Sequence, residues 1–186
     1  MKSRTKLLWL APLIGIVIAL VGCGLPSVYP FYTEKDVVFE PGLVGVWVDQ
    51  HDASGHGTRF EKDGEKAYKI RDIEEKNTNF YSAHLFRLGD HLFMDCLMTE
   101  PEQEIPAHLL LKVEQIQPTF RYTVLNEDWL SKLFEKQPNA LRHYDNEDTG
   151  DKGIILTADT AELQAFLKQY GGTKEAFGDI TELKRQ

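Results

Sequence analysis

Apolar and polar residues alternate with a period of two through most of the chain between Leu43 and Leu125, and short polar turns interrupt the alternation. This period places successive side chains on opposite faces of a strand, so it predicts strands rather than helices. The predicted strands span 43–49, 58–62, 67–71, 80–88, 91–98, 107–116 and 120–125. Turns this short join antiparallel neighbours, so the sheet is a meander. Because an open sheet of this size has long unpaired edges, we expect it to curl strongly or to close into a barrel.

The pattern changes after Asn126. This residue, followed by Glu127 and Asp128, can cap a helix over 129–136, whose apolar positions form one stripe. A second helix is predicted over 161–170, with Asp159 or Thr160 as its N-cap. The stretch 153–157 predicts a further strand between them. We therefore predict a mainly β (α+β) fold, an antiparallel meander of about eight strands, curled or barrel-like, with two helices in the C-terminal third.

Charge and cysteine content exclude two classes of protein. The 186 residues include 21 Lys+Arg and 29 Asp+Glu, for a formal charge of −8. A nucleic-acid-binding surface needs a basic patch, so we expect no nucleic-acid partner. Two cysteines are too few for a small domain held together by disulfides.

The first 22 residues are typical of an export signal. Lys2, Arg4 and Lys6 precede an apolar run over 7–22, and no acidic residue occurs before it. As a helix this run is roughly 24 Å long, which falls short of the ~30 Å hydrocarbon core of a bilayer. We predict that residues 1–22 are a signal peptide. The alternative, an uncleaved membrane helix, is disfavoured by the length of the run and by Pro12 and Gly15 within it.

The end of the run, Leu20-Val21-Gly22-Cys23, resembles the lipobox of bacterial lipoproteins. The resemblance implies cleavage between Gly22 and Cys23 and attachment of a diacylglycerol to the sulfur of Cys23, usually followed by a third acyl chain on its amine. Two or three acyl chains hold a protein stably on a membrane. Since Gly24 and not Asp follows the cysteine, the resemblance implies sorting to the outer membrane, facing the periplasm, if the organism is diderm.

Processing at this position would leave a more acidic chain with a single free cysteine. The mature chain has 18 Lys+Arg and 29 Asp+Glu, a formal charge of −11, and Cys96 has no partner for a disulfide. Residues 23–42 hold three prolines and predict the lipidated cysteine and an extended tether, part of which lies against the domain through its aromatic residues. Residues 43–186 are predicted to form a single globular domain, and we expect a chain beginning near Glu40 to fold.

The opening of the first strand, Leu43-Val44-Gly45-Val46-Trp47, is similar to the Gly-x-Trp segment of lipocalins, which are eight-stranded meander barrels. The resemblance implies that Trp47 closes one end of a barrel that encloses a ligand cavity. It also implies an arginine that stacks on the tryptophan, for which Arg121 is the candidate. The chain departs from the family by placing a helix before the eighth strand instead of after it.

Three clusters match the ligand types of a metal site, and each has a simpler explanation. His51 and His56 with Asp49 and Asp52 offer zinc ligands, but a Gly-containing polar turn explains them.

A second candidate is a set of soft sulfur ligands for Cu(I). Met94, Cys96 and Met98 share a strand face, but Leu92 lies on the same face and core packing explains all four.

A third candidate metal site resembles the first half of a calcium-binding loop. Asp145, Glu147, Thr149 and Gly150 occupy the expected positions, but Leu156 stands where the loop requires Glu, so an acidic turn is the better interpretation.

The remaining histidines, His84, His91, His108 and His143, are scattered and accompany no recognised nucleophile motif. We therefore predict no catalytic residue, metal or cofactor. The expected function is that of a non-enzymatic lipoprotein, membrane-attached through Cys23, that contacts envelope proteins or wall components. The alternative is a lipocalin-like carrier of an apolar small molecule, which requires a lined cavity of roughly 300 Å³ or more.

Overall fold

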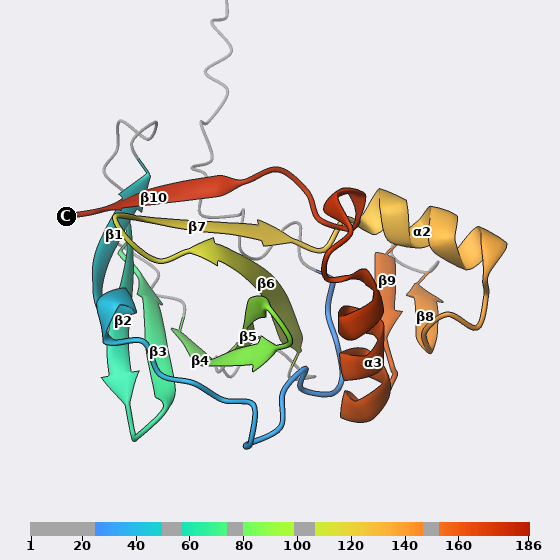
Figure 1. The fold of residues 1–186 in the computed structure, drawn as a ribbon, viewed down its shortest axis with the longest axis horizontal. Coiled ribbons are helices and arrows are strands. Elements are labelled where there is room, and N and C mark those ends of the chain that lie inside the picture. The colour runs from blue at the N-terminus through green and yellow to red at the C-terminus, as the bar shows by residue number, and fades with distance from the viewer. Residues whose placement is uncertain (1–24, 50–56, 74–79, 99–106, 147–152) are drawn as a thin grey trace, which may run out of the picture.

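The computed structural model describes residues 25–49, 57–73, 80–98, 107–146 and 153–186. Within these residues, eight antiparallel strands form a closed barrel in the order β1-β10-β7-β6-β5-β4-β3-β2 (Figure 1). The barrel strands are β1 (Gly45–Asp49), β2 (Gly57–Asp63), β3 (Ala67–Asp72), β4 (Phe80–Leu88), β5 (His91–Met98), β6 (His108–Gln115), β7 (Thr119–Val124) and β10 (Thr181–Arg185). The predicted antiparallel barrel is confirmed.

The eighth strand of the barrel is not the one predicted. Residues 153–157 contain β9 (Gly153–Leu156), which pairs with β8 (His143–Asn146) in a separate two-stranded sheet outside the barrel. The barrel is closed by β10, which lies between β7 and β1. The sequence of β10 is mostly charged, and only its Leu183 is buried. It therefore lacks the apolar alternation from which a strand could be predicted.

The two predicted helices are present. Helix α2 spans Glu127–Lys136, and the side chain of its N-cap Asn126 accepts a hydrogen bond from the backbone N–H of Trp129. Helix α3 spans Thr160–Tyr170, and Asp159 is its N-cap. Two short 3-10 helices, η1 (Pro41–Leu43) and η2 (Lys174–Ala176), precede β1 and β10.

The barrel interior is a core of apolar side chains that includes the fully buried Trp47. Its indole N–H donates to the backbone oxygen of Leu43 at 2.8 Å. The guanidinium of Arg185 lies over the indole, 5.8 Å from the ring centroid, and donates to the oxygen of Val44 at 2.8 Å. Gly45 has a φ of +148°, and a Cβ there would meet the Arg185 side chain at 3.1 Å. Both facts explain the glycine of the Gly-x-Trp segment.

The prediction that Arg121 stacks on this tryptophan is wrong. Phe120 and Tyr122 point into the barrel, so Arg121 between them points outward, where it pairs with Glu182 at 3.5 Å. Arg185 lies over the Trp47 ring instead, because it is the direct cross-strand partner of Trp47 on β10.

A second core lies outside the barrel wall. The outer faces of β4, β5 and β6 supply Phe86, Phe93 and Leu110, and α2, α3 and β9 cover them. Residues 25–39 also contribute, through Leu25 and Phe31. In Figure 1 this N-terminal segment runs from beside β9 along the barrel toward β1.

Candidate functional site

The N-terminal segment, residues 25–39, fills two gaps in the barrel wall. Ser27 forms an antiparallel bridge with His108, next to the part of β6 that β7 does not reach. Val37 forms the same kind of bridge with Phe86, beyond the last residue of β4 that β3 pairs. In each place the segment supplies backbone hydrogen bonds to strand residues that have lost a neighbouring strand. It is therefore part of the folded body, although it precedes the predicted domain start at Leu43.

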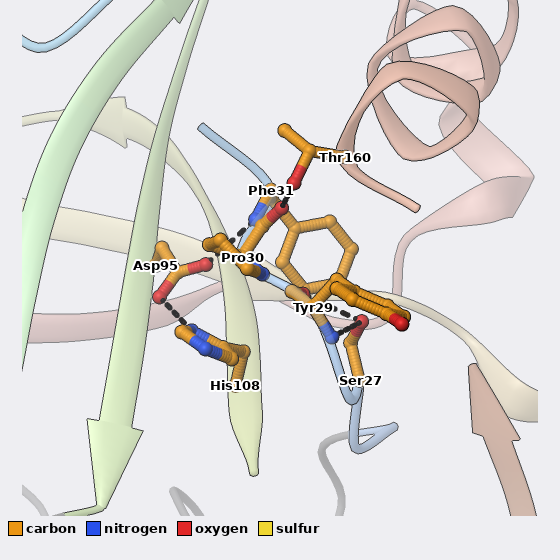
Figure 2. Close-up of polar contacts among 7 residues, drawn as sticks. All are labelled: Ser27, Tyr29, Pro30, Phe31, Asp95, His108 and Thr160. Carbon is orange, nitrogen blue, oxygen red and sulfur yellow. Dashed lines mark hydrogen bonds and ion pairs between the residues drawn. The ribbon is translucent and has the colours of Figure 1, made fainter. Parts of the chain in front are cut away.

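A buried carboxylate holds the middle of this segment. Asp95, on the outer face of β5, is 1% exposed, and its Oδ2 accepts a hydrogen bond from the backbone N–H of Phe31 at 2.8 Å. Its Oδ1 accepts from Nδ1 of His108 at 2.7 Å (Figure 2). A buried carboxylate needs partners of this kind, because an unpaired charge in the protein interior is strongly destabilising. Both oxygens of Asp95 are thus occupied by contacts within the protein.

Helix α3 holds the same stretch from the other side. The hydroxyl of Thr160 donates to the backbone oxygen of Pro30 at 2.8 Å (Figure 2). Gln164, which is buried, donates from Nε2 to the oxygen of Phe31 at 3.2 Å and to Asp36 Oδ2 at 2.9 Å. The segment therefore lies clamped between β5 and α3, two elements far apart in the sequence.

An aromatic stack covers the next part of the cluster. The ring of Tyr32 lies on that of His84, with centroids 4.4 Å apart, and His84 is the cross-strand partner of Asp95. Burial, together with Asp95 and Glu34, raises the pKa of Tyr32 to about 12. Burial lowers the pKa of His84, although Asp95 and Glu34 act in the opposite direction. The arrangement favours a neutral tyrosine and a neutral imidazole, as expected of groups packed for structure.

The pairing of His84, Asp95 and His108 was missed by the sequence analysis, which treated the histidines as scattered. A signal was present, because Ala83-His84-Leu85 and Ala107-His108-Leu109 are similar triplets that place a polar residue on the outer face of two strands flanking β5. Of the four histidines that were treated as scattered, the other two lie elsewhere: His143 stacks on Phe134 with ring centroids 3.7 Å apart, and His91 lies against Phe93.

The metal-site candidates fall partly outside the described residues. Asp49 is in β1, whereas His51, Asp52 and His56 are not described. Met94 and Cys96 point into the barrel core, as the packing interpretation predicts, and burial raises the pKa of the Cys96 thiol. Glu147, Thr149 and Gly150 of the acidic turn are not described either. No three or more His, Cys, Asp or Glu side chains in the described part of the chain are grouped as metal ligands.

The barrel interior contains little free space. Among the described residues, a cavity of about 20 Å³ lies between Thr58, Tyr81, Cys96, Leu109 and Phe120. A cavity of this size has room for about one water molecule. It is far smaller than the roughly 300–1,000 Å³ of typical small-molecule sites.

The predicted lipidation site at Gly22 and Cys23 lies outside the described residues, which begin at Leu25. Among the helices that the structure describes, none combines the length and the hydropathy needed to span a bilayer. The chain matched no protein-family model, no curated protein and no solved structure.

Proposed function

We propose that this chain is a lipid-anchored protein of the bacterial envelope, attached through Cys23, whose barrel domain is a non-enzymatic binding or interaction module. The observation that carries the proposal is the lipobox-like Leu20-Val21-Gly22-Cys23, which follows a basic head and an apolar run of export-signal type. If the organism is diderm, Gly24 favours the outer membrane, with the domain facing the periplasm.

The contacts of the buried polar cluster give Asp95 a structural role and not a catalytic one. General acid or base catalysis needs a titratable group within hydrogen-bond reach of a substrate. Asp95 is instead buried, with its oxygens engaged by His108 and Phe31. Recognition by this domain would then use its outer surface, and envelope proteins are the partners we propose.

The alternative function, a carrier of an apolar small molecule, draws support from the Trp47–Arg185 contact at one end of a closed eight-stranded barrel. The cavity of about 20 Å³ weighs against it. Titration with a fluorescent fatty acid discriminates the two: saturable binding that a bulky substitution at Leu109 abolishes would favour the carrier.

Metabolic labelling tests the anchor. Cells expressing the full chain are fed an alkyne-bearing palmitate, and the protein is assayed for label and for membrane association. We expect both in the parent and in Cys96→Ala, which removes the other cysteine, and neither in Cys23→Ala. Label or membrane retention in Cys23→Ala, or a mass spectrum with an intact Met1 and a free Cys23 thiol, would overturn the proposal.

A further inference from the structure

Residues 26–28 lie along β9, on the side away from β8, and extend the two-stranded β8–β9 sheet through one parallel bridge. Ser27 pairs in parallel with Leu156, and hydrogen bonds join Leu156 to both Pro26 and Val28 at 2.8 and 3.0 Å. On the other side of β9, Ile155 is the antiparallel partner of Tyr144. Because Ser27 and Leu156 are parallel partners, the residues before them, Pro26 and Ile155, also lie side by side. Pro26, Ile155 and Tyr144 therefore form a row across the sheet.

The two faces of this sheet have different surroundings. Leu25, Ile154 and Leu156 are buried in the second core beneath α2 and α3. Because side chains alternate along a strand, Pro26, Val28, Ile155 and Tyr144 lie on the opposite face, which we call the reverse face. Val28 is 43% exposed and Tyr144 is 53% exposed, and the neighbouring Tyr29 is 47% exposed. These are three of the five large hydrophobic residues that are exposed in the described part of the chain.

The distance to the proposed anchor is short. Leu25 is 5% exposed and fixed in the core, and only Gly24 separates it from Cys23. Consecutive Cα atoms are about 3.8 Å apart, so the Cα of Cys23 lies within about 8 Å of that of Leu25. The headgroup layer of a bilayer is itself roughly 5–8 Å thick on each side. If the acyl chains are in the bilayer, the sheet that begins at Pro26 must therefore be at its surface.

We propose that the reverse face, with Tyr29 beside it, lies on the lipid bilayer that carries the anchor. This inference rests on the proposed lipidation of Cys23. Tyrosine suits the position because its ring is apolar and its hydroxyl binds water and headgroups, so it is enriched at membrane interfaces. The contact is apolar and not electrostatic, since the mature chain carries a formal charge of −11. The nearby Arg142 is already paired with Asp159 and Glu162.

Spin labels on the lipidated protein test the orientation. The mature chain is reconstituted in vesicles of phosphatidylethanolamine with a minority of phosphatidylglycerol, with a label at Tyr144→Cys, at Val28→Cys or, as control, at Glu65→Cys. Glu65 is exposed at the β2–β3 turn, away from this sheet. Cys96 is buried and Cys23 carries lipid, so neither competes for the label. The two test positions come from separate segments, so misfolding of one variant leaves the other informative.

Accessibility to a water-soluble nickel chelate and to oxygen gives the result. We expect the labels at positions 144 and 28 to lose most of their nickel accessibility and to keep oxygen accessibility, while the label at 65 stays open to nickel. Anchored protein with nickel-accessible labels at 144 and 28 would overturn this orientation and leave the anchor intact. Labels shielded from both reagents would indicate a protein partner or a second copy on this face and would also overturn it. Protein that does not float with the vesicles would refute the anchor and the orientation together.

Discussion

The two cores of this protein are built in different ways. The barrel core is made by strands that mostly follow one another in the sequence, so neighbours from β1 to β7 are joined as hairpins and only β10 pairs with strands distant in sequence. The second core joins residues as far apart as Leu25 and Phe177, and it depends on the N-terminal segment that crosses the outside of the barrel. The strands from β1 to β7 are therefore locally encoded, whereas closure of the barrel by β10 and formation of the second core require distant parts of the chain to meet.

Removing the N-terminal segment should have the largest effect. Leu25, Phe31 and Val37 are buried, and burial of such side chains contributes about 1.5–3 kcal/mol each. Their combined loss is comparable with the ~5–15 kcal/mol that stabilises a typical domain. We therefore expect a chain beginning at Glu40 to bind a hydrophobic dye and to lose its cooperative urea transition, in contrast to the expectation from sequence alone.

The matched control for this truncation is a chain that begins at Gly24, which keeps the whole segment. Equal urea midpoints for the two chains would show that the second core does not need residues 25–39, and the contrast drawn between the cores would fail.

Asp95→Ala should be the next largest change. It leaves His108 and the N–H of Phe31 without their buried acceptor, and removal of one partner of a buried pair costs about 3–5 kcal/mol. Asp63→Ala, at an exposed carboxylate of β2, is the control and should change the unfolding free energy by less than about 0.5 kcal/mol.

Hydrogen exchange sharpens this test by separating the cores. In Asp95→Ala the amide of Phe31 should exchange faster, while the amides of the β2–β3 pair should exchange at their parent rates. Uniform acceleration throughout the barrel would mean that the two cores unfold as one unit.

Arg185→Ala probes the barrel core alone. It removes the guanidinium from the Trp47 ring and the hydrogen bond to Val44, so we expect a loss of about 1 kcal/mol in the free energy of unfolding. Arg121→Ala removes only a solvent-exposed pair with Glu182 and should cost about 0.5 kcal/mol or less. A larger urea-midpoint shift for Arg121→Ala would show that Arg121, and not Arg185, stabilises the Trp47 end of the barrel.

The smallest expected effect is a pH dependence at His84. Burial lowers the pKa of His84 below the ordinary value of 6.5, and the neighbouring His108 lowers it further. The negative charges of Asp95, Glu34 and Asp63 act in the opposite direction but are outweighed. The unfolded chain then binds the proton more tightly, so His84 contributes fully to stability above pH 6.5 and loses that contribution as the pH falls through its lowered pKa.

His84→Phe keeps a ring to stack on Tyr32 and removes the titration. Thermal midpoints measured from neutral pH down to about pH 5 should therefore fall less in this variant than in the parent. An identical pH profile in the two proteins would exclude His84 as a source of the dependence.

Elements whose determinants are close together in the chain could be predicted from the sequence. The period-two alternation predicted the strands from β1 to β7. The N-cap residues Asn126 and Asp159 predicted where α2 and α3 begin. It failed at β10, because a strand with one buried residue is specified by its neighbours β7 and β1 and hardly by its own pattern. The clamp on Phe31 was also missed, since alternation places Asp95 on the outer face without revealing what covers it.

Residues within a few positions of one another specify the alternating strands, the helix caps and the motif at Cys23, and composition alone gives the acidic charge. The tertiary structure decided which strand closes the barrel, which arginine covers Trp47 and where the N-terminal segment lies. These outcomes depend on contacts such as that between Phe31 and Asp95, whose partners are separated by 64 positions. A local pattern contains no record of such a partner, because the choice is made by the packing of the whole chain.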